Sequence, residues 1–419
     1  MSLPVLTAGG DPRWEAELTA ALGIGDHGVE VVRRCVDVAD LLAAAAAGLA
    51  RAVVVSADLR RFDGAAVARL HAAGVAVIGV AADSAGQARL HQIGSDRVLA
   101  TGASAGEVAA ALRDALLDPP ARTGDTEPGG PTAPLGGGGD PIGEVVAVWG
   151  PTGAPGRTTI AVNIAAELAA RGHRVTVVDA DTYGAAVGQV LGLLDEAPGV
   201  AAACRQANHG TLDAVALSGL AAEVAPGLRV LTGVTRVDRW PEIRPAALAT
   251  VLELCRRDAA YVVVDCGFCL EQDEELAYDT AAPRRNGASI AALEAAHAVV
   301  MVTGSDPLGL ARFVRAGEHC RGLAGTARVI PVANRLRRGV VGAGDPRRAV
   351  STALERYAGL TSVHIVPEDR AACDAALAAG RTLAEAAPRS PARAAIAELA
   401  VAITGVTPGR ARRRQGRDR

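Results

Sequence analysis

The sequence predicts an α/β protein with two doubly wound, mostly parallel sheets, and three observations support this fold class. Short apolar segments rich in valine recur along the chain, and most are followed by a stretch with the apolar spacing of a helix. Buried parallel strands are continuously apolar, and the alternating helices cover both faces of the sheet. The third observation is a break at residues 119–142, where proline and glycine dominate and no apolar period remains. We expect a flexible linker there between two domains.

The N-terminal domain, residues 1–118, is predicted to have a flavodoxin-like fold. Its strand segments alternate with helical ones such as Trp14–Leu22 and Val108–Leu116, the pattern of a parallel sheet covered by helices. The expected strands are Leu3–Thr7, Val29–Val32, Ala52–Val55, Val75–Val80 and Asp96–Ala100.

The larger domain is predicted at residues 143–404, followed by a basic, disordered tail at 405–419. Its first strand is expected at Val145–Trp149 and its second at Val175–Val178. Further strands are expected at Leu228–Leu231, Tyr261–Val264, Ala298–Val302, Ala327–Val332 and Val363–Val366.

Composition indicates a cytoplasmic protein without an integral membrane segment. Half of the 419 residues are apolar, but the longest apolar runs are alanine-rich and too short to span a bilayer. The net charge of -3 gives no overall attraction to nucleic acid or anionic lipid. Seven scattered cysteines indicate reduced thiols, and Cys266 and Cys269 have metal-ligand spacing without a second ligand pair. All 43 basic residues are arginine, so no lysine is available to any site.

The turn between the first strand and first helix of the larger domain, Gly150–Thr159, has the features of an altered phosphate-binding loop. Gly153 and Gly156 permit the backbone angles that aim successive N–H groups at one anion. Thr158 stands where a hydroxyl joins a magnesium shell, and Thr159 begins the helix within reach of a phosphate. Arg157 occupies the position at which a lysine normally contacts the terminal phosphates.

Acidic residues follow two of the predicted strands. Asp179 and Asp181 end the second strand, and Asp265 follows the apolar segment Tyr261–Val264. Because ligands bind at the carboxyl ends of parallel strands, these carboxylates are candidates for a magnesium and nucleotide site.

In these motifs the chain resembles the MinD/ParA family of deviant Walker P-loop ATPases, and its two domains resemble CpaE-like members. The family's loop, Lys-Gly-Gly-x-Gly-Lys-Thr, falls on residues 152–158. Three positions differ: Thr152 replaces the signature lysine that reaches the partner's ATP in a dimer, Ala154 replaces a glycine, and Arg157 replaces the phosphate-binding lysine. Asn163 matches the asparagine of the family's first helix.

The resemblance implies a doubly wound P-loop NTPase domain that binds ATP and Mg²⁺ and forms a nucleotide-dependent homodimer. It assigns Asp181 to the orientation of water and Arg157 to catalysis, Asn334 to adenine, and Pro367 to the wall of the base pocket. The nucleotide would contact the loop residues Gly153, Ala154, Pro155, Gly156, Arg157, Thr158 and Thr159. Magnesium would be held, partly through water, by Thr158, Asp179 and Asp265.

The altered loop leaves two functions open. The first is an ATPase with weak or lost turnover that acts as a spatial organiser in pilus or secretion assembly, division-site placement or chromosome partition. The second is a non-hydrolysing scaffold of the same fold, because the guanidinium of Arg157 keeps the charge of lysine but is larger and planar. Arg284 or Arg285 is a candidate replacement for the cation missing at Thr152, and a solvated basic loop is the alternative.

A dinucleotide-binding dehydrogenase is the alternative fold interpretation. Gly150, Gly153 and Gly156 follow a strand with glycine-rich spacing, and Asp179 could bind a ribose. Common short-chain dehydrogenases use a tyrosine and lysine pair, which a chain without lysine cannot supply. Thr158 and Asn334 have no role in that scheme, so the sequence favours the ATPase fold.

The N-terminal domain resembles a receiver that has lost its chemistry, and we expect a pseudo-receiver that docks a protein partner. Ser56 falls at the phosphoacceptor position, Ala81 at the hydroxyl position and Ala100 at the lysine position. Phosphorylation of Asp58 remains an open alternative. The arginine-rich tail has no apolar face for a membrane, although contact with nucleic acid or anionic lipid is open to it. The resemblance also leaves open recruitment to a pole, septum or inner membrane face by a partner.

Overall fold

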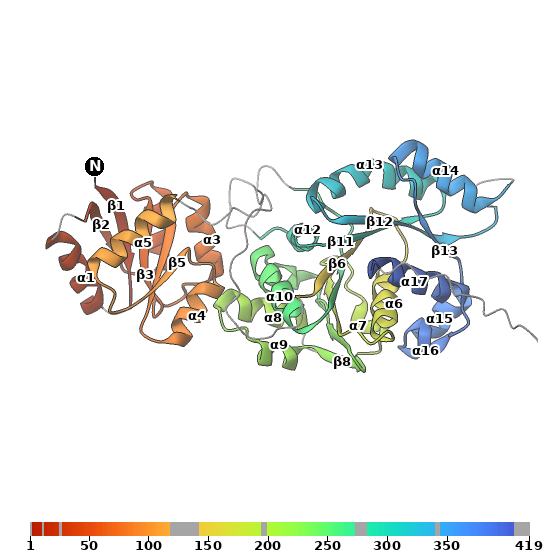
Figure 1. Cartoon of the computed structure of the whole chain (residues 1–419), viewed down its shortest axis with the longest axis horizontal. Helices are drawn as coiled ribbons and strands as arrows, with labels where there is room; N and C mark the ends of the chain where they lie inside the picture. The colour runs from red at the N-terminus through yellow and green to blue at the C-terminus, as the bar shows by residue number, and fades with distance from the viewer. Residues whose placement is uncertain are drawn as a thin grey trace, which may run out of the picture. The chain divides into compact units, whose positions relative to one another are not determined.

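The computed structural model describes residues 2–10, 12–24, 27–117, 142–193, 199–272, 283–339 and 344–405. Two compact units make up the chain (Figure 1). The first is formed mainly by Met1–Asp140, and the second by Pro141–Ala202, Ala214–Glu271 and Arg284–Arg419. Except for residues 142 and 405, the predicted linker and tail lie outside the described residues.

The first unit contains a five-stranded parallel sheet in the order β2-β1-β3-β4-β5. This is the strand order of flavodoxin-type doubly wound folds. One face carries a core that includes Phe62, Leu70 and Leu90, and the other carries Leu18 and Leu112. The elements are β1 (Leu3–Ala8), α1 (Pro12–Ile24), β2 (Val29–Cys35), α2 (Val38–Ala46), β3 (Ala52–Ser56), α3 (Gly64–Ala72), β4 (Ala76–Ala81), α4 (Ser84–Gln92), β5 (Arg97–Ala100) and α5 (Ala105–Leu117).

The second unit is built on an eight-stranded sheet in the order β13-β12-β11-β6-β10-β7-β9-β8. Every pair is parallel except β8 and β9 at one edge, so the predicted doubly wound, mostly parallel sheet is confirmed. The strands are β6 (Glu144–Trp149), β7 (Val175–Ala180), β8 (Ala222–Ala225), β9 (Leu228–Leu231), β10 (Tyr261–Cys266), β11 (Ala298–Gly304), β12 (Arg328–Leu336) and β13 (His364–Pro367). The edge strand β8 was not predicted.

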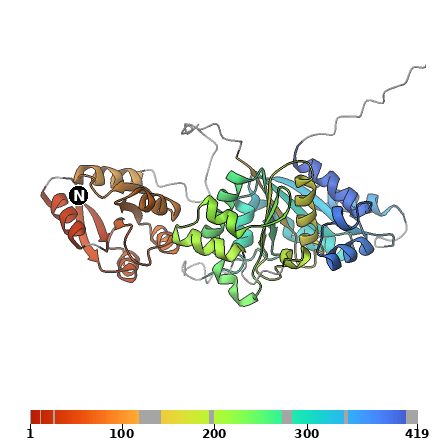
Figure 2. The same cartoon turned by 90° about the horizontal axis from the view of Figure 1, so that it is seen from below.

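Helices cover both faces of this sheet (Figures 1 and 2). Helices α6 and α17 pack together over a core of strand valines, while α10, α12 and α13 form the second layer. The helices that follow residue 141 are α6 (Arg157–Ala169), α7 (Val187–Val190), α8 (Gly199–His209), α9 (Ala214–Leu220), the 3-10 helix η1 (Val237–Glu242), α10 (Pro245–Asp258), α12 (Gly287–Glu294), α13 (Pro307–Ala324), α14 (Pro346–Ala358), α15 (Arg370–Ala379), α16 (Leu383–Ala386) and α17 (Pro391–Ile403). No helix among the described residues is both long and apolar enough to cross a membrane.

The start of α6 differs from the starts of α13 and α15. Asp306 and Asp369 cap α13 and α15 by accepting a backbone N–H of the first turn. At α6 the capping position is Gly156, in the left-handed conformation, and no side chain caps the first turn. These N–H groups are therefore available to an anion beside the loop that follows β6.

Candidate functional site

The loop between β6 and α6 requires glycine at two positions. Gly153 and Gly156 have φ angles of 77° and 84°, which favour glycine over residues with a side chain. A Cβ atom at Gly153 would collide with the guanidinium of Arg312, and one at Gly156 with the amide of Asn334. The same amide donates to the Pro155 carbonyl at 2.9 Å, so β12 fixes the last turn of the loop.

Arg157 folds back across this loop. Its Nη1 donates to the carbonyls of Ala154 at 3.2 Å and Gly150 at 3.4 Å, and its Nη2 lies 3.7 Å from Asp181 Oδ2. Its buried Nε has no hydrogen-bond partner among the described residues. The head group is thus held by the loop and by one carboxylate at the site, with donor capacity left over.

Thr158 and Asp265 form the next part of the site. Asp265 is the last residue but one of the central strand β10 and is 1% exposed, and the Thr158 hydroxyl donates to its Oδ2 at 2.6 Å. Burial raises the pKa of Asp265 well above its usual range, and the neighbouring Asp179 adds to this shift. Its Oδ1 is buried and has no hydrogen-bond partner in the described chain. An unpartnered carboxylate oxygen beside a threonine hydroxyl matches the donor set of a hydrated Mg²⁺ ion.

The two acids at the carboxyl end of β7, Asp179 within the strand and Asp181 directly after it, are placed differently. Asp179 is completely buried, and its two oxygens accept the backbone N–H groups of Asp181 at 3.2 Å and Val187 at 3.0 Å. Burial raises its pKa to about 7. Asp181 accepts from Tyr183 at 2.8 Å and Gly184 at 3.0 Å through Oδ1, which leaves Oδ2 on the side of Arg157. Asp179 therefore holds the loop in shape, and Asp181 presents an oxygen to the site.

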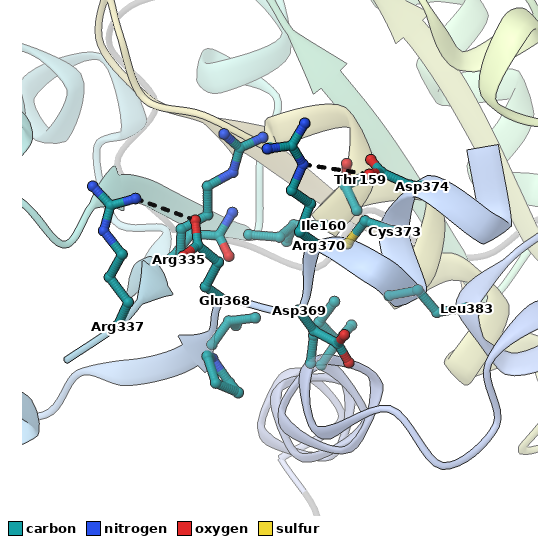
Figure 3. Close-up of a pocket in the computed structure, with 16 residues that line it drawn as sticks. Thr159, Ile160, Arg335, Arg337, Glu368, Asp369, Arg370, Cys373, Asp374 and Leu383 are labelled. Atoms are coloured by element: carbon teal, nitrogen blue, oxygen red, sulfur yellow. Dashed lines mark hydrogen bonds and ion pairs between the residues drawn. The ribbon is translucent and has the colours of Figure 1, made fainter. Parts of the chain in front are cut away.

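Two cavities of the second unit meet at this loop. The loop cavity, about 450 Å³, is lined by residues 156–159 together with Ala154, Asp181 and Tyr183. The base cavity, about 480 Å³, is lined by Asn334, Pro367 and residues of α15 and α17 (Figure 3). Gly156 and Thr159 line both. Most of the predicted site residues thus line one of these two cavities, whereas Gly153, Pro155, Asp179 and Asp265 line neither.

One wall of the loop cavity is aromatic, a feature that was not predicted from the sequence. Tyr183 and Phe268 line the cavity, and their ring centroids lie 4.8 Å apart. Arg285 lies 3.9 Å from the centroid of the Tyr183 ring and donates to the Thr182 carbonyl at 3.1 Å. The whole chain has three Phe and four Tyr, and this scarcity was the one feature of the sequence that could have drawn attention to Tyr183 and Phe268. Arg285 is held by its own chain in this arrangement.

Cys266 is the last residue of β10, and Cys269 lies three residues further along the chain. Cys266 is buried, which raises its pKa, while Cys269 is partly exposed and accepts a hydrogen bond from Asn286 Nδ2 at 3.3 Å. Within the described part of the chain, no group of three or more His, Cys, Asp and Glu side chains is arranged to hold a metal ion directly. A magnesium ion here would accordingly keep most of its water ligands.

The second unit has the fold of P-loop NTPases of the ParA and MinD type, and one family model matches part of it. A ParA family model, described as NUBPL iron-transfer P-loop NTPase, matches residues 141–218. The cell division ATPase MinD of Pyrococcus furiosus is 19% identical and has a TM-score of 0.50, with 64% of this chain and all of that chain covered. A ParA family ATPase from Chlorobium tepidum is 19% identical with a TM-score of 0.52, covering 62% of this chain and 98% of that one. At this identity the likeness establishes the fold.

A curated relative matches a shorter stretch. The iron-sulfur cluster carrier protein of Salmonella typhimurium is 32% identical over 121 residues, or 29% of this chain. The match spans 31% of that relative's length. The fold prediction for the larger domain is confirmed by the two solved structures, whereas the likeness to this relative is confined to one segment.

Proposed function

We propose that the second unit binds an adenine nucleotide across the base cavity and the loop cavity. One observation carries the proposal: the two cavities meet at Gly156 and Thr159, at the uncapped start of α6. A nucleotide has this shape, with an apolar base at one end and phosphates at the other. The helix N-terminus and the loop N–H groups would face the phosphates, and Asn334 and Pro367 would face the base.

We propose that Mg²⁺ accompanies the nucleotide, held by the Thr158 hydroxyl and through water by Asp265. The unpartnered Oδ1 of Asp265 is the observation that fits this role. When bound, the ion would neutralise charge on the phosphate oxygens. Asp179, whose oxygens accept two backbone N–H groups, would support the site by fixing the residues around Asp181.

We further propose that ATP hydrolysis depends on Asp181 and is slowed by Arg157. The attacking water would be oriented by a hydrogen bond that it donates to Asp181 Oδ2. This same oxygen lies 3.7 Å from the Arg157 guanidinium. The guanidinium also binds two loop carbonyls. To bind a terminal phosphate fully, the Arg157 guanidinium would have to give up some of these contacts, which costs free energy. A lysine has a single charged nitrogen and would have fewer such contacts to give up.

A non-hydrolysing scaffold is the second candidate, and the same contacts favour it. Thr152 supplies no cation, and the Arg312 guanidinium that covers Gly153 lies 3.5 Å from the Thr152 carbonyl. In that case nucleotide would bind and set the conformation of the loop after β7 without being turned over.

We propose that the whole chain acts as a CpaE-like, nucleotide-switched organiser that forms a homodimer. Its pseudo-receiver unit would dock the protein partner, and that partner would recruit the otherwise cytoplasmic protein to a pole, septum or membrane face. Pilus or secretion assembly, division-site placement and chromosome partition are the processes served by such organisers.

The first experiment is calorimetric titration of the full chain with ATP and ADP in the presence of Mg²⁺. Saturable binding with one site per chain is expected, and no binding of either nucleotide would overturn the proposed function. Phosphate release is then measured for the wild type and Asp181→Ala. A rate that falls in the variant supports the ATPase, whereas equal rates at background level leave the scaffold.

A further inference from the structure

Arg335 occupies a position that neither the loop motif nor the predicted base pocket includes. It ends the run Pro331–Arg335 near the carboxyl end of β12, directly after Asn334. Besides Gly156 and Thr159, it is the one residue that lines both the base cavity and the loop cavity. Its side chain therefore belongs to the junction of the two cavities.

The backbone at this point departs from regular strand geometry. Arg335 has a φ angle of 56°, one of two positive values among the described residues that are not glycine. The register of β12 against β13 shifts between Ala333 and Leu336. In a regular strand neighbouring side chains point to opposite faces, yet here Asn334 and Arg335 line the same base cavity. The strained conformation thus turns the Arg335 side chain toward the base cavity, whereas a regular strand would place it on the opposite face of the sheet.

The charge of Arg335 is also placed differently from that of its neighbours. Two further arginines line the base cavity, and each has an acidic partner: Arg337 lies 3.5 Å from Glu368, and Arg370 lies 3.4 Å from Asp374 (Figure 3). Among the described residues no ion pair is formed by Arg335. Its exposed guanidinium stands between these two pairs in Figure 3, available to an anion at the cavity junction.

We propose that Arg335 is a positioning residue that binds the innermost phosphate of the bound nucleotide. This inference rests on the proposed function. With the base beside Asn334 and the outer phosphates at the loop, the phosphate attached to the ribose falls at the residues common to both cavities. A guanidinium can hold such a phosphate through two parallel hydrogen bonds. Arg335 would thereby distinguish nucleotides from nucleosides and fix the distance between base and loop.

The test compares adenosine, AMP and Mg-ADP binding to the full chain by calorimetry. The variant is Arg335→Asn, because asparagine tolerates a positive φ and removes the charge without adding strain. Arg337→Asn is the matched control, since this side chain lines the same cavity but is paired with Glu368. A thermal unfolding curve for each variant establishes that it is folded.

The wild type is expected to bind AMP more tightly than adenosine, and Arg335→Asn should reduce this preference at least tenfold. Arg335→Lys should restore part of it, and Arg337→Asn should leave it unchanged. If wild type binds Mg-ADP but Arg335→Asn keeps the full preference for AMP over adenosine, the role of Arg335 is wrong and the proposed function stands. If wild type binds no nucleotide at all, the proposed function fails first. An equal loss in both arginine variants would assign the effect to the general charge of the cavity and contradict a specific role for Arg335.

Discussion

The central strands of the two units are nearly the same in sequence and differ at their carboxyl ends. In β3 the residues Val53–Val55 are followed by Ser56, and in β10 the residues Val262–Val264 are followed by Asp265. All six valines are completely buried in parallel sheets. The valines form strands in both places, whereas the next residue decides whether the sheet edge can hold a charged ligand.

The neighbouring strands repeat this contrast. In the first unit β4 and β5 end in Ala81 and Ala100, while in the second unit β7 leads to Asp181 and β12 carries Asn334. A doubly wound sheet therefore provides the place for a site, and the residues after each strand provide the chemistry. Four changes test this difference, from the largest expected effect to the smallest.

Replacing Gly156 by alanine should have the largest effect on the second unit. A Cβ atom there would collide with the Asn334 amide, and the φ angle of 84° adds backbone strain. We expect a loss of about 1–3 kcal/mol in the free energy of unfolding. We also expect nucleotide affinity to fall roughly 100-fold, because the last turn of the loop must move. Denaturant unfolding and calorimetric titration measure the two quantities.

Gly172→Ala is the matched control for this change. Gly172 has a φ angle of 86°, close to that of Gly156, but nothing lies within 4 Å of the position of its Cβ. Its substitution should cost about 1 kcal/mol of stability and leave nucleotide affinity unchanged. Equal loss of affinity in both variants would mean that backbone strain alone, and not the fit of the loop against β12, explains the effect.

Asp265→Asn should abolish the magnesium-dependent part of nucleotide affinity, roughly a tenfold change in dissociation constant. Asparagine can still accept the hydrogen bond from Thr158, so the loss reports the charge at the end of β10. Titrations with Mg²⁺ and with a chelator separate the two contributions. Ser56→Ala, at the corresponding position of β3, is the control. An unchanged magnesium dependence in Asp265→Asn would remove this carboxylate from the proposed metal site.

Much of the fold could be predicted from the sequence because its strands are buried on both faces. The predicted segments Leu228–Leu231 and Ala52–Val55 match β9 and β3 within one residue. Strand β8 was missed, since an antiparallel edge strand of four partly buried residues has no continuous apolar run. The strand at Ala327–Val332 was predicted too short because β12 continues into the polar residues Asn334 and Arg335.

The positions of candidate-site residues could be predicted where a local motif fixes the backbone. They could not be predicted where contacts between distant segments determine the position of a side chain. Gly156 and Thr158 lie where the spacing of the loop puts them. The burial of Asp179 under two backbone N–H groups depends on the path of the chain to Val187, which no local pattern specifies. The contact between the Tyr183 and Phe268 rings joins segments far apart in sequence, and the left-handed angle of Arg335 occurs at an irregularity in strand pairing.

Arg157→Lys should increase phosphate release, by roughly tenfold, with a smaller effect on affinity. Lysine would place one charged nitrogen near the loop carbonyls, and it would remove the buried Nε that has no partner among the described residues. Arg171→Lys, at the opposite end of α6, where Arg171 pairs with Glu167 at 3.2 Å, is the control for the loss of an arginine. Turnover that stays at background in Arg157→Lys would show that the loop arginine is not what limits hydrolysis, and would favour the scaffold.

The smallest effect is expected in the first unit, where Asp58→Asn should change neither nucleotide binding nor modification by a phosphoryl donor. Asp58 is exposed, and its Oδ1 accepts the Gly10 N–H at 3.1 Å. The ends of β4 and β5 are alanines, so no side-chain hydroxyl or cation from these two residues would stabilise a phosphorylated carboxylate beside them. Incubation of the full chain with acetyl phosphate and Mg²⁺, followed by intact mass measurement, should give no added phosphoryl group. A phosphoryl group that appears on the wild type and is absent from Asp58→Asn would show that this sheet edge retains receiver chemistry. Both units would then carry a site at the sheet edge, and they would differ in the ligand that each site takes.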